Sequence, residues 1–283
     1  MIEIPESYSL AAQLKEHLLG KTAADAIAAK SPHGFAGYSC DSAEFGERLR
    51  GKTVTGTCRF GGFVEIELGD TKLAFDDGIR IRLYEPGAKL PEKHQLMVEF
   101  ADGYTLICTI QMYGGFTLTK DGEFGSTHYQ NSRAKIDPMS DECTLEHFTE
   151  QMNNVKPNYS AKAFLATEQR FPGLGNGVLQ DILFNARINP RKKIQDFTQD
   201  EKLNLYKVMR ETLAEMITNN GRDTTTDILG NKGGYETILS SKTINKPCPI
   251  CGDAIVKEAF MGGSVYYCPT CQPYEKKMPR KKD

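Results

Sequence analysis

The 283-residue sequence contains no run of 18 apolar residues, and this absence excludes a membrane-spanning helix. The first six residues, Met1 to Glu6, include two acids, so we expect no secretory signal peptide. Internal repeats and low-complexity segments are also missing. The chain is long enough for two globular domains and one small additional module.

A strong net charge is missing as well, because 35 Lys and Arg nearly balance 37 Asp and Glu. Along the chain the charges are unevenly divided. Residues 156–283 hold 20 basic and 14 acidic side chains, a net charge of +6, whereas residues 1–155 carry −8. A basic C-terminal half is compatible with a nucleic-acid partner, and the acidic half argues against an extended basic groove there. The basic residues within 276–282 could contact phosphates, or they are simply a solvated chain end.

Four of the eight cysteines form two Cys-x-x-Cys pairs near the C-terminus, Cys248 with Cys251 and Cys268 with Cys271. Each pair places two thiolates on a tight knuckle, so four sulfurs can surround one zinc ion as a tetrahedron. Gly252 follows the first pair, where a knuckle favours a residue that tolerates positive φ. Two disulfides are the alternative, but nothing else in the sequence indicates an oxidising compartment. We predict a ribbon with one structural zinc, and free thiols at the other four cysteines.

Two periodicities follow one another in the N-terminal half. Leucines recur at every fourth position of residues 6–19, which predicts a helix. Residues 53–118 alternate with a period of two, and 64–68 is typical of a half-buried strand. Asp102-Gly103 between two alternating segments is a strong hairpin signal. The sequence therefore predicts one helix packed with an antiparallel β-sandwich or barrel.

From about residue 138 the pattern becomes helical, so the predicted fold class of the whole chain is α+β. Thr198 and Glu201 form a capping-box pattern that opens a long helix. Asn219-Asn220-Gly221 is a stop signal for that helix. Shorter helices are predicted at 144–152, 160–169 and 177–187.

The segment from Phe171 to Asn176 joins two of these helices and contains Gly173 and Gly175. Both glycines allow positive φ and the close approach of another chain segment. Asn176 is expected to open the next helix, whose free N–H groups form an anion site. In a basic half of the chain, a DNA phosphate is the natural ligand. A purely structural turn between packed helices explains the same residues.

Taken together, these features resemble the bacterial formamidopyrimidine-DNA glycosylase and endonuclease VIII family. The resemblance covers essentially the whole chain, and it is most specific in the four-cysteine ribbon, in residues 173–190 and in the opening with Glu3 and Glu6. The family binds duplex DNA and flips out an oxidised base, which implies double-stranded DNA, damaged or abasic, as the partner of a monomeric bacterial protein in the cytoplasm. The implied domains are an N-terminal β-sandwich at 1–132, a helix–two-turn–helix domain at 133–240 and a zinc-ribbon finger with a basic tail at 241–283.

The chain departs from the family at the nucleophile. The family uses an N-terminal proline amine, and Ile2 stands at that position. Removal of Met1 before a bulky β-branched residue is disfavoured, so we expect the amine to remain on Met1, one residue too far. A misplacement of about 1 Å can already cost roughly 100-fold in rate. Glu3 matches the family's catalytic acid or base, and Glu6 matches a second acid of the same opening.

The charged phosphate contacts of the family are replaced too. Gly62 stands at the hairpin lysine position, and Gly263 stands at the arginine position of the ribbon hairpin. Residues 111–114 replace the family's paired arginines before Phe-Gly. Lys162 is a basic residue near the implied phosphate site, or else a solvated helix lysine. The DNA-binding residues that the resemblance leaves in place are Asn176, Gly175 and Lys162.

The sequence therefore predicts a zinc-containing damaged-DNA-binding protein of base-excision repair. Its family-implied glycosylase and abasic-site lyase activity should be weak, altered or absent, with Met1, Glu3 and Glu6 as the candidate catalytic residues. Glu3 could activate water instead of an amine in a monofunctional route. The alternatives are a non-catalytic module for abasic, kinked or branched DNA, and a structural or RNA-associated zinc protein.

Overall fold

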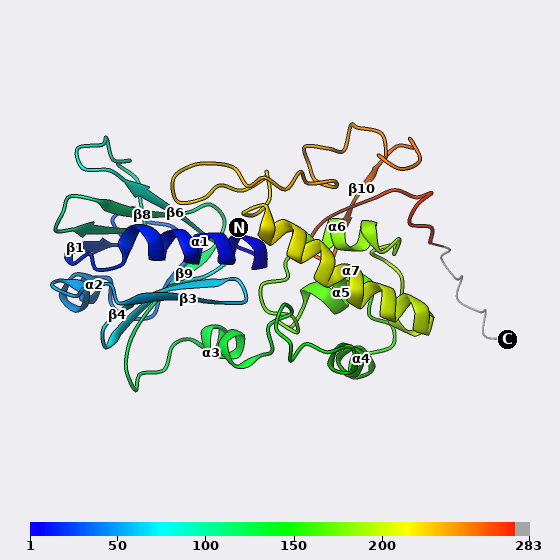
Figure 1. Cartoon of the computed structure of the whole chain (residues 1–283), viewed down its shortest axis with the longest axis horizontal. Coiled ribbons are helices and arrows are strands. Elements are labelled where there is room, and N and C mark those ends of the chain that lie inside the picture. Colours follow the sequence, from blue (N-terminus) through cyan, green and yellow to red (C-terminus); the bar gives the residue numbers. More distant parts are fainter. Residues whose placement is uncertain (275–283) are drawn as a thin grey trace. The chain divides into compact units, whose positions relative to one another are not determined.

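The structure is a computed structural model that describes residues 1–274 (Figure 1). Its backbone contacts divide the chain into two compact units. Unit 1 comprises residues 1–138, 171–174 and 214–236, and unit 2 comprises residues 139–170, 175–213 and the chain from 237 onward. Residues 276–282 lie outside the described residues, so their contact with phosphates stays a prediction. Within residues 1–274, no helix is long and apolar enough to cross a membrane.

Unit 1 is built on two β-sheets whose buried side chains share one core. The first has the strand order β1-β7-β8-β6, and the second has the order β2-β9-β5-β4-β3. All strand pairs are antiparallel except β2 with β9, which run parallel. Gly103, at φ +87°, lies in the predicted hairpin between β7 and β8. The strands are β1 (Ala23–Ala28), β2 (Ala36–Tyr38), β3 (Gly56–Phe60), β4 (Phe63–Leu68), β5 (Thr71–Phe75), β6 (Ile79–Tyr84), β7 (Leu96–Phe100), β8 (Thr105–Ile110) and β9 (Gly114–Lys120).

The predicted N-terminal helix is present as α1 (Ile4–Leu18), drawn in blue in Figure 1. Its leucines 10, 14 and 18 are buried in the core of unit 1, and the helix packs on β3 and β4. Helix α2 (Ser42–Leu49) packs against β1, and α3 (Thr127–Ala134) follows the last strand. The sequence pattern of residues 6–19 thus gave the helix and its buried face correctly.

Strand β4 corrects one expectation, because Glu65 is fully buried rather than solvent-facing. The Tyr129 hydroxyl donates to the Glu65 carboxylate at 2.5 Å, and Arg133 Nη1 lies 3.1 Å from both carboxylate oxygens. A buried charge is tolerated when it is paired and hydrogen-bonded. Alternation along the strand could not reveal a partner that lies 68 residues away.

Unit 2 is helical up to the ribbon. Thr198 N–H donates to Glu201 Oε2 at 2.9 Å and Glu201 N–H to Thr198 Oγ1 at 3.2 Å, which confirms the capping box. Asn220 and Gly221, both at positive φ, follow the end of α7 as predicted. Helix α6 begins at Val178, so Asn176 does not open it as expected. The helices are α4 (Leu145–Asn153), α5 (Ala161–Ala166), α6 (Val178–Asn185), a 3-10 turn (Ile194–Asp196) and α7 (Gln199–Thr218), whose last residues belong to unit 1.

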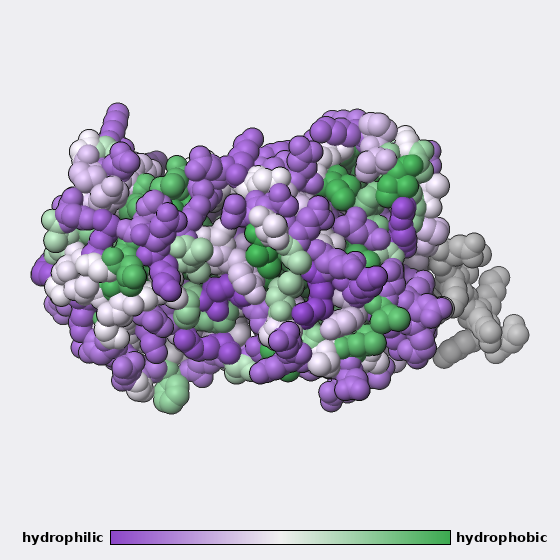
Figure 2. Space-filling view, viewed as in Figure 1, coloured by the Kyte–Doolittle hydropathy of each residue, from purple (hydrophilic) through white to green (hydrophobic). Residues whose placement is uncertain are grey.

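The ribbon of unit 2 is a two-stranded antiparallel hairpin of β10 (Val256–Phe260) and β11 (Gly263–Tyr267). On the face of the molecule in Figure 2, hydrophobic side chains form small groups separated by hydrophilic ones. Scattered exposed hydrophobic residues of this kind are normal on a protein surface and do not by themselves mark an interface.

Candidate functional site

The start of the chain is embedded in unit 1. Ile2 is buried in the core at 3% exposure, whereas Met1 is half exposed. The Ile2 N–H donates to the Asp77 carbonyl at 2.7 Å, and the Ile4 N–H donates to the Gly173 carbonyl at 2.9 Å. In this structure the Ile2 nitrogen is an amide bonded to Met1, and an amide is not an amine nucleophile.

Glu6 is buried in a cluster of hydrogen-bond donors. Arg222 Nε lies 2.9 Å from one carboxylate oxygen and Nη2 lies 2.8 Å from the other, and the Thr225 hydroxyl and the Glu3 N–H also donate to it. Burial acts to raise the pKa of Glu6, but the charge and hydrogen bonds of Arg222 outweigh it and lower the pKa. A carboxylate held in this way favours a positioning role for Glu6 at the start of α1.

Glu3 belongs to the same cluster. It is buried at 3% exposure, and its Oε2 lies 3.5 Å from Arg222 Nη1. Arg222 therefore stands between both acids that the sequence singled out, and the structure brings Glu3, Glu6 and Met1 to one corner of unit 1. Sequence reasoning missed Arg222, which lies 216 residues from Glu6. The only available signal was its place next to Gly221, within a segment that resembles the family.

The hairpin between β3 and β4 packs its backbone against the start of the chain, at the corner of unit 1 that holds Met1, Glu3 and Glu6. A Cβ on Gly62 would lie 3.0 Å from the Ile2 carbonyl oxygen. Gly173, at φ +77°, approaches Gly61 so closely that a Cβ on it would lie 2.3 Å from the Gly61 carbonyl carbon. This confirms the predicted positive φ and close approach at Gly173, whereas Gly175 is not at positive φ. A side chain at position 62 would require the neighbouring backbone to move.

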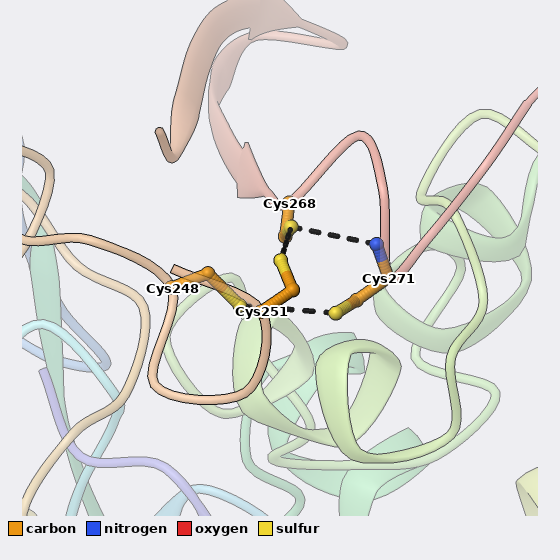
Figure 3. A group of neighbouring side chains, drawn as sticks. All are labelled: Cys248, Cys251, Cys268 and Cys271. Carbon is orange, nitrogen blue, oxygen red and sulfur yellow. Dashed lines mark hydrogen bonds between the residues drawn. The ribbon is translucent and has the colours of Figure 1, made fainter. Parts of the chain in front are cut away.

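In unit 2, the four cysteines of the ribbon converge, with their sulfurs gathered in one place (Figure 3). Cys248 Sγ lies 3.8 Å from Cys271 Sγ, Cys251 Sγ lies 3.4 Å from Cys268 Sγ, and all four sulfurs are within 4.8 Å of one another. Four sulfurs about 2.3 Å from one zinc would be roughly 3.8 Å apart, so the cluster fits this ion. Gly252 has a φ of +80°, as predicted for the knuckle.

Side chains in helix α6 and just before it bind the backbone of the ribbon. Asn176 Nδ2 and Gln180 Nε2 each donate to the Ser264 carbonyl at 3.1 Å. Gln180 Oε1 accepts the Tyr266 N–H at 3.0 Å. The Asn176 Oδ1 atom is buried and has no hydrogen-bond partner among residues 1–274. Asn176 thus holds the ribbon hairpin in place through its amide N–H, and its buried amide oxygen is left as an acceptor without a donor.

Lys162 lies beneath the same hairpin. It is only 4% exposed, and its ammonium group donates to the Phe260 carbonyl at 2.7 Å. Burial lowers the pKa of Lys162. A Cβ on Gly263 would lie 3.4 Å from Lys162 Nζ and 3.7 Å from the Asn176 amide atoms. The structure therefore brings Lys162, Asn176 and Gly263 together, and Lys162 is not a solvated helix lysine. The carbonyl of Gly175 accepts the Leu179 N–H at 3.3 Å, at the first turn of α6.

Comparison with known proteins shows which proteins this chain resembles. A family model described as a zinc finger found in FPG and IleRS matches residues 245–273. Together with the four-sulfur cluster, this match shows that the ribbon binds one structural zinc. Among curated relatives, a formamidopyrimidine-DNA glycosylase of Lactobacillus delbrueckii subsp. bulgaricus is 28% identical over 82% of this chain and 86% of its own length. One from Bacillus cereus is 26% identical over 96% and 99%.

Solved structures agree in fold. The chain is similar to the Lactococcus lactis Fpg in complex with abasic-site DNA, with a TM-score of 0.81, 22% identity and coverage of 96% of this chain and 100% of that one. It is also similar to MutM (Fpg) of Thermus thermophilus, with a TM-score of 0.80, 21% identity and coverage of 97% and 100%. The ribbon, the relatives along the chain and the shared fold agree, and the chain is similar over almost its whole length to formamidopyrimidine-DNA glycosylases.

Proposed function

We propose that this chain is a damaged-DNA-binding protein of base-excision repair in which the family's N-terminal amine chemistry is weak or absent. The curated relatives are named formamidopyrimidine-DNA glycosylases, and the similar Lactococcus lactis structures hold abasic or damaged DNA. Duplex DNA with a damaged or abasic position is the proposed partner of a monomer that works in the bacterial cytoplasm at the nucleoid. Asn176, Gly175 and Lys162 are the proposed DNA-binding residues, and the three-domain division of the chain remains part of this proposal.

The position of Ile2 is the observation that supports this proposal most strongly. The residue at the nucleophile position has a buried side chain and an amide nitrogen that donates to Asp77. Gly62 and Gly263 have no charge with which to stabilise the phosphates around an extruded sugar. Electrostatic contacts of this kind are commonly worth about 10²-fold or more in rate. Standard imine formation and strand cleavage should therefore be strongly impaired.

Two chemical routes remain for the retained groups. In its neutral form, the α-amine of Met1 can attack an aldehyde and form an imine with loss of water. Alternatively, the Glu3 carboxylate accepts a proton from water, whose oxygen bonds to the sugar C1′ while the bond from C1′ to the base breaks and the base leaves with a proton, so no covalent enzyme intermediate forms. A non-catalytic DNA-binding module is the second candidate function. It is favoured because Ile2, Gly62 and Glu6 are engaged in packing and hydrogen bonds within the N-terminal corner.

Trapping with borohydride distinguishes these possibilities. The full-length protein is incubated with abasic-site duplex and borohydride, and binding is measured in parallel on the same duplex. We expect binding with little or no covalent adduct. Efficient trapping on the Met1 amine, mapped by peptide mass, would overturn the proposal. Base release without trapping, lost in Glu3→Gln, would support the water route, and binding without either activity would support the non-catalytic module. Intact-mass measurement establishes whether Met1 is retained.

A further inference from the structure

Unit 1 contains a pocket of about 340 Å³ beside the N-terminal corner, and none of the candidate catalytic, DNA-binding or zinc-binding residues lines it. We call it the aromatic pocket. Its volume is at the lower end of the roughly 300–1,000 Å³ typical of small-molecule sites. The space suits one planar ring system with part of its substituent, and all its lining residues belong to unit 1. Its rings are Phe35, Tyr38, Phe63, Tyr113 and Phe116.

The rings are arranged as a stacking surface. Tyr38 and Phe116 are stacked with their centroids 5.3 Å apart and lie on neighbouring strands, β2 and β9. At the rim, Phe35 is 74% exposed and Tyr113 is 43% exposed, so these two rings are open to a ligand, whereas Phe63 and Phe116 are buried behind them. Successive aromatic faces bind bases by stacking, each worth roughly 1–3 kcal/mol by alanine substitution. The pocket therefore favours a flat, π-bonded ligand.

One carboxylate gives the aromatic pocket its polarity. Asp76 lines it, and no Lys or Arg does so. The Gly78 N–H donates to Asp76 Oδ1 at 3.2 Å, and no side chain among residues 1–274 donates to this carboxylate. Burial raises the pKa of Asp76 to about 6, so the group is mainly ionised at neutral pH. His128 also lines the pocket, but no Lys or Arg does, so the pocket lacks a permanent positive charge for a phosphate, while Asp76 suits a ligand edge with N–H donors.

The location links the pocket to the N-terminus. The Tyr113 hydroxyl donates to Asp77 Oδ2 at 3.2 Å and lies 3.5 Å from Met1 Sδ. Tyr113 thus contacts the start of the chain while its ring lines the pocket. The pocket and the N-terminal corner therefore share Tyr113.

We propose that the aromatic pocket binds one unpaired guanine, with the base stacked among its rings and Asp76 accepting the adjacent N1–H and N2–H groups of its Watson–Crick edge. This inference rests on the proposed DNA-binding function. Guanine is the natural base that offers two neighbouring N–H donors to a single carboxylate, and extruded bases are read through this edge and by stacking. Adenine, cytosine and thymine each offer a less complete match to Asp76.

The test compares duplexes that carry one bulged guanine, one bulged adenine or no bulge, using the full-length protein. We expect the guanine bulge to bind about tenfold more tightly than the adenine bulge, as fits hydrogen bonds to a charged group. Asp76→Asn should remove this preference and leave binding of the fully paired duplex unchanged. Tyr113→Leu should weaken binding of both bulges. Asp70→Asn, an exposed acid of the same unit, is the matched control and should keep the preference.

A second measurement separates this inference from the proposed function. Free GMP is titrated into the protein, and the backbone amide signals of Gly114 and Gly115, which line the pocket, are followed by NMR. We expect GMP to shift these signals in the wild type more than AMP does, and the effect to be lost in Asp76→Asn. If no duplex binds but GMP shifts these amides, the proposed function fails and the pocket stands. A guanine preference that survives Asp76→Asn, or GMP shifts only elsewhere, would overturn the inference.

Discussion

The zinc ribbon of unit 2 and the N-terminal corner of unit 1 are stabilised in different ways. The ribbon is organised by four thiolates at short sequence spacing. Side chains of α6 bind the backbone of the ribbon; for example, Gln180 accepts the Tyr266 N–H. The corner is organised by contacts between distant segments. Glu6 pairs with Arg222, and the backbone of Gly61 touches that of Gly173.

The difference bears on which functions are retained. A metal site needs every ligand, so all four cysteines are present in the ribbon. In the N-terminal corner, Ile2 and Gly62 pack into the unit. The acids Glu3 and Glu6 both lie next to Arg222. The ribbon is thus built around a metal site, whereas the corner is built by packing and by one buried cluster of charges.

Removing zinc should cause the largest loss of stability, and the loss should be confined to the ribbon. Structural zinc contributes on the order of 10–16 kcal/mol in zinc-finger peptides, because binding is coupled to folding. After chelation, or in Cys268→Ser, we expect hydrogen-exchange protection to be lost between Cys248 and Gln272 and kept in β4 and β5. Full protection of the ribbon in protein shown to be zinc-free by metal analysis would contradict the assignment.

Breaking the Glu6–Arg222 pair should have the next largest effect. Arg222→Leu leaves a buried carboxylate without its partner, which typically costs about 3–5 kcal/mol of unfolding free energy. Arg48→Leu is the control, since Arg48 pairs with the more exposed Glu44 and Glu123 and such pairs contribute roughly 0–1 kcal/mol. Urea unfolding of both variants measures the difference. Equal losses would show that burial does not distinguish the two pairs.

The same pair predicts an acid dependence. The pKa of Glu6 is lower in the folded protein, so its stabilising contribution is complete above the ordinary value of about 4.3 and is lost as pH falls through the folded value. Urea unfolding between pH 3 and pH 6 should therefore show a steeper loss of stability in the wild type than in Glu6→Gln. Parallel curves would indicate that other carboxylates account for the acid sensitivity.

Asn176→Ala should weaken DNA binding by about 1–3 kcal/mol for all duplexes alike, because it removes the amide donor and the bond to Ser264. Binding titrations on several unrelated duplexes measure this. Asn153→Ala, an exposed residue of α4, is the matched control and should leave affinity unchanged. A loss confined to one DNA sequence would point to base recognition at Asn176 instead.

Gly62→Ala should have the smallest effect, a loss of about 1–2 kcal/mol in stability, since the added methyl group would lie 3.0 Å from the Ile2 carbonyl. Gly34→Ala serves as the control, because a Cβ there meets nothing within 4 Å. Thermal unfolding of both variants provides the comparison. A stabilised Gly62→Ala protein would show that the corner has room for a side chain, and that packing does not explain the missing lysine.

The sequence by itself determined the features that depend on local spacing. The two Cys-x-x-Cys pairs specified the ribbon, the leucine spacing specified α1, and Thr198 with Glu201 specified the start of α7. Each of these signals is read within one or two turns of chain, where backbone geometry fixes which side chains meet. Even there, Asn176 does not open α6, whose N-cap is Gly177, because the Asn176 side chain binds the ribbon rather than the helix.

Only the tertiary structure decided how the charged and small residues are used. Glu65 lies in an alternating strand, yet it is buried because Arg133 and Tyr129 reach it from α3. Lys162 on α5 has the sequence context of a surface residue, but the ribbon carbonyl of Phe260 covers it. In each case the partner lies about 60 to 100 residues away along the chain. Local sequence patterns do not reveal contacts between residues this far apart, because the folded structure decides which of them meet.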